Sequence, residues 1–390
     1  MRIKQVVLYP ACRVIALVAL ASCSSDDGQA VLSSNEGARE AYIDTVAIGR
    51  IPSNPDVTLF GVEDASLSDS GVLITESSTS TIRRFSLRGD EGEPIGVKGR
   101  GPGEFLSLRW TDLAGDTLVA YDGTQRRISY FLRDGSHIRD VLVPVPALYS
   151  FVQPVGRFSD GTLLIRGFTQ ATLNQFGTYR GQGTLFRMSR DGKKTDSLGV
   201  YQHNEIVKTA TANGGYTVSS RPLGRTSFVF AWGDSIYIVD NKDRAIEKWT
   251  SGGVKRIFPD ERRDSIMATA EDVRRERTHF IRGDSPDGRI AKAFDAMPAP
   301  AVLPSYGWGL DDWGAPATRT SNGALWLTLY ESTRQTQPRW SVMNLAKGTT
   351  RIISANRGMR ILDASDTLAL VLLKDADGVE TVELRRIQSK

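Results

Sequence analysis

The chain has 390 residues, of which 40% are hydrophobic and 24% charged, so it can form a folded core and is not globally disordered. Its formal net charge is +4, but the first 22 residues carry three cations and no acid, so the remainder is nearly neutral. A nearly neutral body excludes nucleic-acid binding through a global electrostatic field. Cys12 and Cys23 are the only cysteines, so the residues after Cys23 can form neither a disulfide nor a thiolate metal site.

The first 22 residues have the pattern of a secretory signal peptide. Cations near the start precede an apolar run over 14–21, which is shorter than the about 20 residues that a membrane-spanning helix needs. The tetrad LASC at 20–23 then resembles the lipobox of bacterial lipoproteins. This resemblance implies cleavage before Cys23 and acylation of its thiol. The alternative is an ordinary secretory signal with an accidental cysteine.

The segment 23–40 is small and polar, and it predicts a flexible tether between the lipid and the fold. Ser24, rather than Asp, follows the lipobox cysteine. In Gram-negative lipoproteins such a residue implies sorting to the outer membrane. The sequence therefore predicts a bacterial cell-envelope protein, periplasmic or surface-facing, that contacts the membrane through its N-terminal lipid.

From residue 41 onward one hairpin pattern recurs. A turn rich in Ser, Gly, Asp and Asn precedes a β-rich run, and a second strand follows that usually ends in a glycine turn. The leading aliphatic residues of the six copies are separated by 45, 45, 73, 89 and 43 residues. Three of these gaps match the period of ~40–45 residues expected for a propeller blade. The leading residues are Leu73, Leu118, Leu163, Ile236, Leu325 and Leu368.

These copies predict an all-β fold, a six-bladed β-propeller over 41–390. The β-rich run 41–51 has no hairpin partner of its own, whereas the last copy, about 360–387, supplies three strands. An incomplete ring would expose a strand edge, so we expect 41–51 to join the last blade and close the ring. We expect a monomer.

The glycine-rich stretch GVKGRGPGEF, 96–105, could be a phosphate cradle or a turn between blades. A phosphate loop directs successive backbone N–H groups at the anion, with a helix N-terminus behind them. Here Pro102 removes an N–H, Glu104 adds a carboxylate, and the sequence that follows is strand-like. The spacing matches neither GxGxxG nor GxxxxGKS. We therefore interpret it as a crossover between two blades.

This stretch and the residues after it resemble a known family. IGVKGRGPGEF, followed by LVAYDGTQRRISYFLRDG, is similar to the six-bladed β-propeller lipoproteins of bacteria, relatives of the NHL-repeat and TolB-like propellers. The stretch 321–331 resembles a late-blade strand of the same family, and the likeness covers most of 41–390. It implies the architecture and assigns no activity. The residues that fit the family's second pattern are Asp122, Arg127, Ile128, Phe131 and Gly135.

The longest gap between copies contains a predicted helical insertion, about 259–284. Ile266, Ala270, Val273 and Phe280 fall at helical spacing, and Thr269 followed by Asp272 resembles a capping box. Arginines alternate with acidic residues along this segment. The alternation favours a self-paired, solvated helix surface over a basic patch.

The loop that returns from the insertion contains the best candidate ligand surface. Its aromatic rings could stack on a sugar or a peptide, and its carboxylates could accept hydrogen bonds. The alternative is that the aromatic residues pin the loop to a blade. The candidate residues are Tyr306, Trp308, Asp311, Asp312 and Trp313.

The sequence contains no evident catalytic constellation. GxSxG is absent, and His137, His203 and His279 do not occupy matching repeat positions, so we expect neither a metal nor a cofactor. The leading hypothesis is a lipid-anchored, non-catalytic propeller that binds a protein, peptide or glycan at the cell envelope. The alternative is a propeller enzyme, a lyase, lactonase or glycan hydrolase, with carboxylates or a metal in the central channel.

Overall fold

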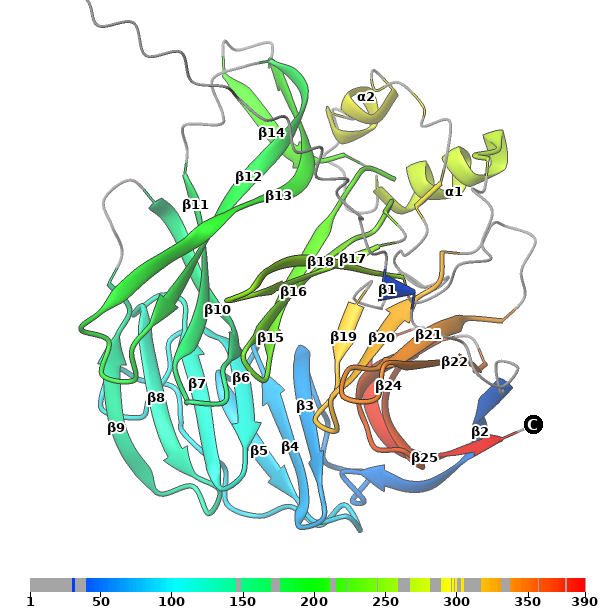
Figure 1. Ribbon diagram of the computed structural model, residues 1–390. Coiled ribbons are helices and arrows are strands. Elements are labelled where there is room, and N and C mark those ends of the chain that lie inside the picture. Colours follow the sequence, from blue (N-terminus) through cyan, green and yellow to red (C-terminus); the bar gives the residue numbers. More distant parts are fainter. Residues whose placement is uncertain are drawn as a thin grey trace, which may run out of the picture.

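The fold consists of β-strands in five sheets around a common axis, as seen in a computed structural model (Figure 1). The signal peptide predicted for 1–22, the lipidation site Cys23 and most of the predicted tether 23–40 lie outside the described residues. The structure describes residues 30–31 and 40–389, except for 145–148, 170–175, 211–214, 222, 244, 259–266, 281–288, 296, 298, 300–302, 305–316, 331–336, 357 and 376.

Four sheets are separate from one another and follow the chain in order. The first two contain β3 (Val62–Ser68), β4 (Gly71–Glu76) and β5 (Thr81–Phe85), then β6 (Leu108–Ala114), β7 (Thr117–Asp122), β8 (Arg127–Leu132) and β9 (His137–Leu142). The third contains β10 (Tyr149–Arg157), β11 (Leu163–Thr169), β12 (Gly177–Met188), β13 (Thr195–Ala210) and β14 (Tyr216–Ser220). The fourth contains β15 (Ser227–Trp232), β16 (Ser235–Asp240), β17 (Ile246–Thr250) and β18 (Gly253–Phe258), beside which β1 (Ala30–Val31) pairs in parallel.

The second strand of a sheet is covered on both faces, which explains its sequence. All six residues of β4 are buried, and so are five of the six residues of β7. A strand buried on both faces is an almost continuous apolar run rather than an alternation of apolar and polar residues. This is the run that recurs along the chain, and it marks the strand that lies between two neighbouring sheets.

The fifth sheet has eight strands, in the order β19-β20-β21-β22-β2-β25-β24-β23. Strand β2 pairs antiparallel with β25 from Ala41 to Ile51, which confirms that the predicted 41–51 strand joins the last copy. The strands are β19 (Ala317–Arg319), β20 (Ala324–Thr328), β21 (Arg339–Asn344), β22 (Thr349–Ser354), β2 (Glu40–Ile51), β25 (Glu380–Ser389), β24 (Leu368–Lys374) and β23 (Met359–Ala364).

The prediction of six separate blades is wrong, because the separate blades number four. The first residues of β2 also pair in parallel with β22, Glu40 opposite Ile352 and Tyr42 opposite Ser354. One strand therefore pairs on both of its edges. It joins two sets of four strands into one continuous sheet, and the fold is an all-β, propeller-like ring with an eight-stranded sector.

The first strand of each set lies innermost in the ring. Strands β3, β6, β10 and β15 contact one another in chain order, and β23 contacts both β19 and β3. The contact between β23 and β3 brings the last set of strands against the first. The fourth and fifth sheets share a core that includes Phe230, Tyr237, Leu325 and Met343, so the ring is closed around a central channel.

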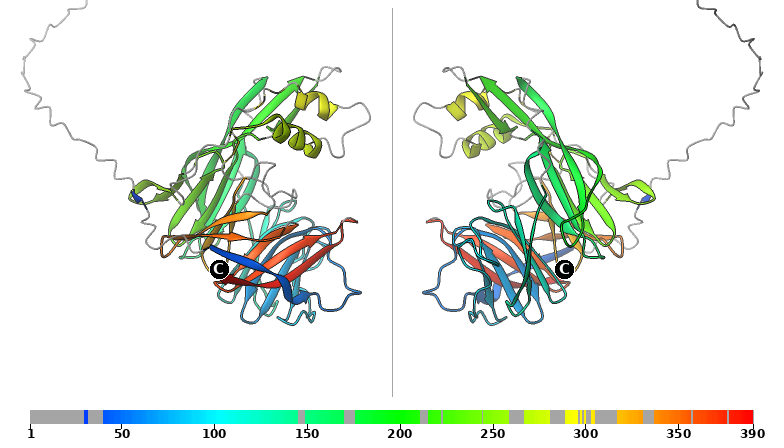
Figure 2. Two further views of the ribbon diagram at one scale, coloured as in Figure 1. Left: turned by 90° about the vertical axis from the view of Figure 1, so that its right-hand side faces the viewer. Right: turned by 90° about the vertical axis from the view of Figure 1, so that its left-hand side faces the viewer.

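The helical insertion contains two helices, α1 (Ala270–Phe280) and the unpredicted α2 (Arg289–Asp295). The predicted capping box is confirmed: the Thr269 backbone N–H donates to the Asp272 carboxylate at 2.9 Å, and the Asp272 N–H donates to the Thr269 hydroxyl at 3.2 Å. Both helices lie beside the long strands β12 and β13, off one side of the ring (Figure 2). Within the described residues, no helix is long and apolar enough to cross a membrane.

Candidate functional site

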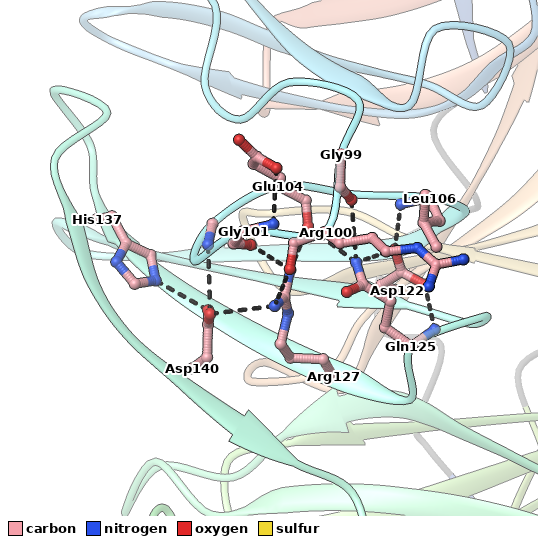
Figure 3. Close-up of polar contacts among 11 residues, drawn as sticks. Gly99, Arg100, Gly101, Glu104, Leu106, Asp122, Gln125, Arg127, His137 and Asp140 are labelled. Carbon is pink, nitrogen blue, oxygen red and sulfur yellow. Dashed lines mark hydrogen bonds and ion pairs between the residues drawn. The ribbon is translucent and has the colours of Figure 1, made fainter.

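The glycine-rich loop 96–105 uses its backbone N–H groups within the protein (Figure 3). Gly99 donates to the Phe105 carbonyl at 3.1 Å, and Phe105 donates to the Val97 carbonyl at 2.9 Å. Gly101 donates to the Glu104 carboxylate at 2.7 Å, which thus occupies the place an external anion would take. The interpretation of the loop as a crossover rather than a phosphate cradle is therefore confirmed.

The family-like pattern after this loop has a structural role. Arg127 donates to the Gly101 carbonyl at 2.7 Å and also to the Glu104 carbonyl, while the Asp122 carboxylate accepts from the Leu106 N–H (Figure 3). Gln125 donates to the Glu104 carbonyl at 3.1 Å. These side chains hold the loop against the second sheet, so they explain the motif without any ligand.

A cavity suited to a ligand opens at one end of the channel. It has a volume of about 1240 Å³, and the turns that join the inner strands to their second strands line it. We call it the channel mouth; its lining includes Ser68, Asp112, Arg157, Trp232, Arg319 and Ser365. Ionic and aliphatic side chains both take part: five arginines and three aspartates lie beside Leu67, Leu87, Leu113, Ile138 and Leu368.

The channel mouth and the helices lie at opposite ends of the inner strands. The turn 320–323 before β20 borders the mouth, whereas Tyr330 follows β20 at its other end. The Arg275 guanidinium of α1 donates to the Tyr330 hydroxyl at 2.8 Å. The helices therefore lie toward the end of the strands that is away from the mouth.

A buried carboxylate orders two arginines at the mouth. Asp112 accepts from Arg157 Nε at 2.9 Å and from Arg319 Nη2 at 2.6 Å, so three sheets are linked through one side chain. The side chain of Asp112 is 6% exposed, and those of Arg157 and Arg319 are 10% and 25% exposed. Ion pairs this enclosed fix the geometry of the guanidinium groups, because neither partner can be released without leaving a buried charge.

A second carboxylate ties the ring at its closure. Asp363 on β23 accepts from the backbone N–H groups of Leu67 and Ser321, each at 2.7 Å. Asp64 on β3 lies nearby and is half-buried. Burial and the neighbouring Asp363 carboxylate raise the pKa of Asp64 to about 7. The inner strands thus contain a carboxylic acid that is partly protonated at neutral pH.

The predicted ligand surface of the return loop, residues 306–313, lies outside the described residues. His137 pairs with Asp140 at 2.8 Å beside the glycine-rich loop. His203 stacks on Phe168 at 4.2 Å, and burial lowers its pKa to about 3. The described residues contain no group of His, Cys, Asp and Glu side chains able to hold a metal ion.

The residues of the channel mouth were not predicted from the sequence, although a signal was present. Asp112, Arg157 and Arg319 each lie six residues before the leading aliphatic residue of their copy. Equivalent positions of a propeller repeat recur around the axis. Comparing the copies for charged residues at one repeat position would have brought these three together.

Comparison with solved structures shows the class of fold. A DUF4221-family protein from Bacteroides vulgatus is 7% identical, with a TM-score of 0.50 over 91% of this chain and 99% of that one. A Bacteroides fragilis protein described as exported is 12% identical, with a TM-score of 0.49 over 90% and 99%. Virginiamycin B lyase from Staphylococcus aureus is 14% identical, with a TM-score of 0.40 over 88% and 99%. No protein-family model and no curated protein matches the chain.

At such identities the likeness concerns the fold alone. The chain is an all-β protein of the propeller-like class, similar in architecture to the Bacteroides vulgatus protein. Propellers carry many unrelated functions, so the activity must be argued from the channel mouth and not from the fold.

Proposed function

We propose that this protein is a non-catalytic, lipid-anchored propeller of the bacterial cell envelope that binds a protein, peptide or glycan at the channel mouth. The observation that carries the proposal is the open cavity of about 1240 Å³ with charged and aliphatic side chains on its wall. Ligand sites are concave and combine apolar contact area with a few fixed polar groups. The paired arginines of the mouth are such fixed groups.

The proposed localisation at the cell envelope rests on the LASC tetrad at 20–23. An acylated Cys23 would anchor the chain to the membrane and leave the propeller exposed to the periplasm or the cell surface. Mass spectrometry of the mature N-terminus tests this. A lipid-modified Cys23, lost together with membrane association in Cys23→Ser, is the expected result; an unmodified N-terminus at another residue would contradict it.

The binding site is tested by filling the mouth. Ala114 is exposed and lines the cavity, so Ala114→Trp obstructs the mouth without burying the new ring. The matched control is Ala346→Trp, on an exposed turn outside the mouth. We expect binding to an array of peptides and glycans to be lost in Ala114→Trp and kept in Ala346→Trp. Equal binding by both variants would contradict the proposed site.

A second candidate function is catalysis by carboxylates in the channel, favoured by the position of Asp64 beside Asp363. A carboxylic acid whose pKa lies near 7 can serve as a general acid or base at neutral pH. Turnover of a lactone or an oligosaccharide that disappears in Asp64→Asn would favour this enzyme. Undiminished turnover in that variant would exclude Asp64 from catalysis.

A further inference from the structure

We infer that the ligand of the channel mouth is an acidic peptide segment, an inference that rests on the proposed function above. Three features carry it: the excess of cations at the mouth, the arginines that cover its aromatic rings, and the exposed aliphatic side chains at its rim. Each feature excludes a different kind of ligand.

The cations of the mouth outnumber its anions. Five arginines line it, against Asp69, Asp112 and Asp116. Asp112 is already shared between two guanidinium groups, so it leaves them with an excess of positive charge. Among the described residues, Arg319 Nε and Nη1 donate to no protein acceptor. An arginine with free donors in a fixed orientation is suited to a carboxylate.

Two of the other three arginines, Arg133 and Arg139, are also held in place. Arg139 donates to the Arg190 carbonyl at 3.0 Å, and Arg133 donates to the Ser70 hydroxyl at 2.8 Å. One bond orients each guanidinium group; Arg133 Nε is buried, whereas the side chain of Arg139 is exposed at the mouth. Preorganised donors lose little conformational entropy when an anion binds. The mouth is therefore ready for several carboxylates along one chain.

The aromatic rings of the mouth are not available for stacking on a sugar. Arg139 lies over the ring of Tyr130 at 4.5 Å, and Arg319 lies over that of Trp232 at 6.0 Å. Arg187 covers the ring of Phe158 at 4.5 Å. A neutral glycan binds largely through exposed aromatic faces. The lining of the channel mouth offers few such faces, because arginines cover its rings.

The rim supplies apolar contacts that match aliphatic side chains. Leu87 and Ile138 line the mouth and are 38% and 49% exposed. Exposed apolar residues around a charged depression mark an interaction site. An extended peptide that alternates carboxylates with aliphatic residues would satisfy both the arginines and the rim.

The test uses the full-length protein in detergent and two labelled octapeptides, Glu-Leu-Glu-Gly repeated twice and the same sequence with Gln in place of Glu. Fluorescence anisotropy measures binding. We expect the acidic peptide to bind at least about tenfold more tightly, and its affinity to fall when NaCl rises from about 50 to about 500 mM. Equal affinity for both peptides would overturn the inference.

The arginine variants identify the groups involved. Arg319→Gln and Arg139→Gln are expected to weaken binding of the acidic peptide by about tenfold each. Arg139 is exposed and outside the Asp112 pair, so its variant remains informative if Arg319→Gln does not fold. Arg274→Gln on α1, on the opposite face, is the control and should leave the affinity unchanged.

The outcomes separate this inference from the proposed function. If Ala114→Trp abolishes binding of both peptides while the arginine variants bind normally, the mouth is the site but its ligand is not acidic. If the acidic peptide binds Ala114→Trp as well as it binds the native protein, both proposals fail. If a uronic-acid oligosaccharide binds and the acidic peptide does not, the mouth remains the proposed binding site but the inference of a peptide ligand is overturned.

Discussion

Asp112 is the residue on which the geometry of the mouth depends most. In Asp112→Asn, Arg157 and Arg319 both lose their anionic partner, and Arg157 is almost wholly buried. Breaking a buried ion pair costs 3–5 kcal/mol, so we expect the free energy of unfolding in urea to fall by about 3 kcal/mol. Asp116→Asn, an exposed residue of the same mouth, should change it by less than about 0.5 kcal/mol. Equal effects would show that the pairs stabilise nothing.

Asp64 makes the stability of the fold depend on pH. Its pKa is about 7 in the folded protein and near the ordinary value of about 3.9 in the unfolded chain, so the folded state binds the additional proton. The stabilisation is fully present below about pH 4 and is lost as the pH rises through 7. We expect the free energy of unfolding to fall by up to about 1.4 kcal/mol per pH unit within this window.

Asp64→Asn should reduce this slope, so the variant gains stability relative to the native protein at pH 8 and not at pH 4. Burial also raises the pKa of Asp363, whose contribution has the same sign and persists in the variant. Urea unfolding between pH 4 and pH 8 measures the difference. Parallel curves for the native protein and the variant would mean that Asp64 titrates alike in both states.

The rigidity of the crossover loop can be tested by comparing Gly96, which lies in the loop, with Gly115, which lies in the turn between β6 and β7. Gly96 has φ +70°, and an added Cβ would collide with the Phe105 ring and lie 2.9 Å from the Gly103 carbonyl oxygen. Gly115 has φ +57° and no atom within 4 Å of such a Cβ. Gly115→Ala therefore measures the conformational cost alone, about 1 kcal/mol, whereas Gly96→Ala should cost about 3 kcal/mol. Similar losses in thermal or urea unfolding would show that the loop adjusts freely.

The sequence predicted elements well where a local pattern specifies them. The double-sided burial of β4 and β7 produces the apolar runs on which the repeat was recognised, and the capping box at Thr269 marks the start of α1. The helix α2 was missed although Ile290, Ala293 and Phe294 fall at helical spacing, because seven residues are too few for the periodicity to stand out. The parallel pairing of β1 with β18 was missed because only two residues of each strand take part.

The arrangement of the whole molecule depends on contacts that no local pattern records. Arg319 and Asp112 are 207 residues apart in the chain, and the parallel pairing of β2 with β22 brings Glu40 opposite the distant Ile352. Propensity and spacing act over a few residues. The need to cover an exposed strand edge predicted that β2 pairs with β25. Nothing local indicated that the other edge of β2 would pair with β22. The eight-stranded sheet and the mouth both arise from such distant pairings.

The double pairing of β2 predicts that ring closure stabilises the entire fold. Removal of residues up to 51 would leave unpaired edges on β22 and β25 and would take Ile43 and Ile51 out of two cores. The buried side chains alone contribute about 1.5–3 kcal/mol each, so the loss approaches the total stability of a domain. Removal up to residue 39 keeps β2 and is the matched control. We expect aggregation on size-exclusion chromatography and no cooperative unfolding for the longer truncation, and native behaviour for the shorter one. Aggregation is expected because exposed strand edges pair with other chains. If the longer truncation stayed monomeric with an unchanged unfolding midpoint, the ring would be stable without its closing strand.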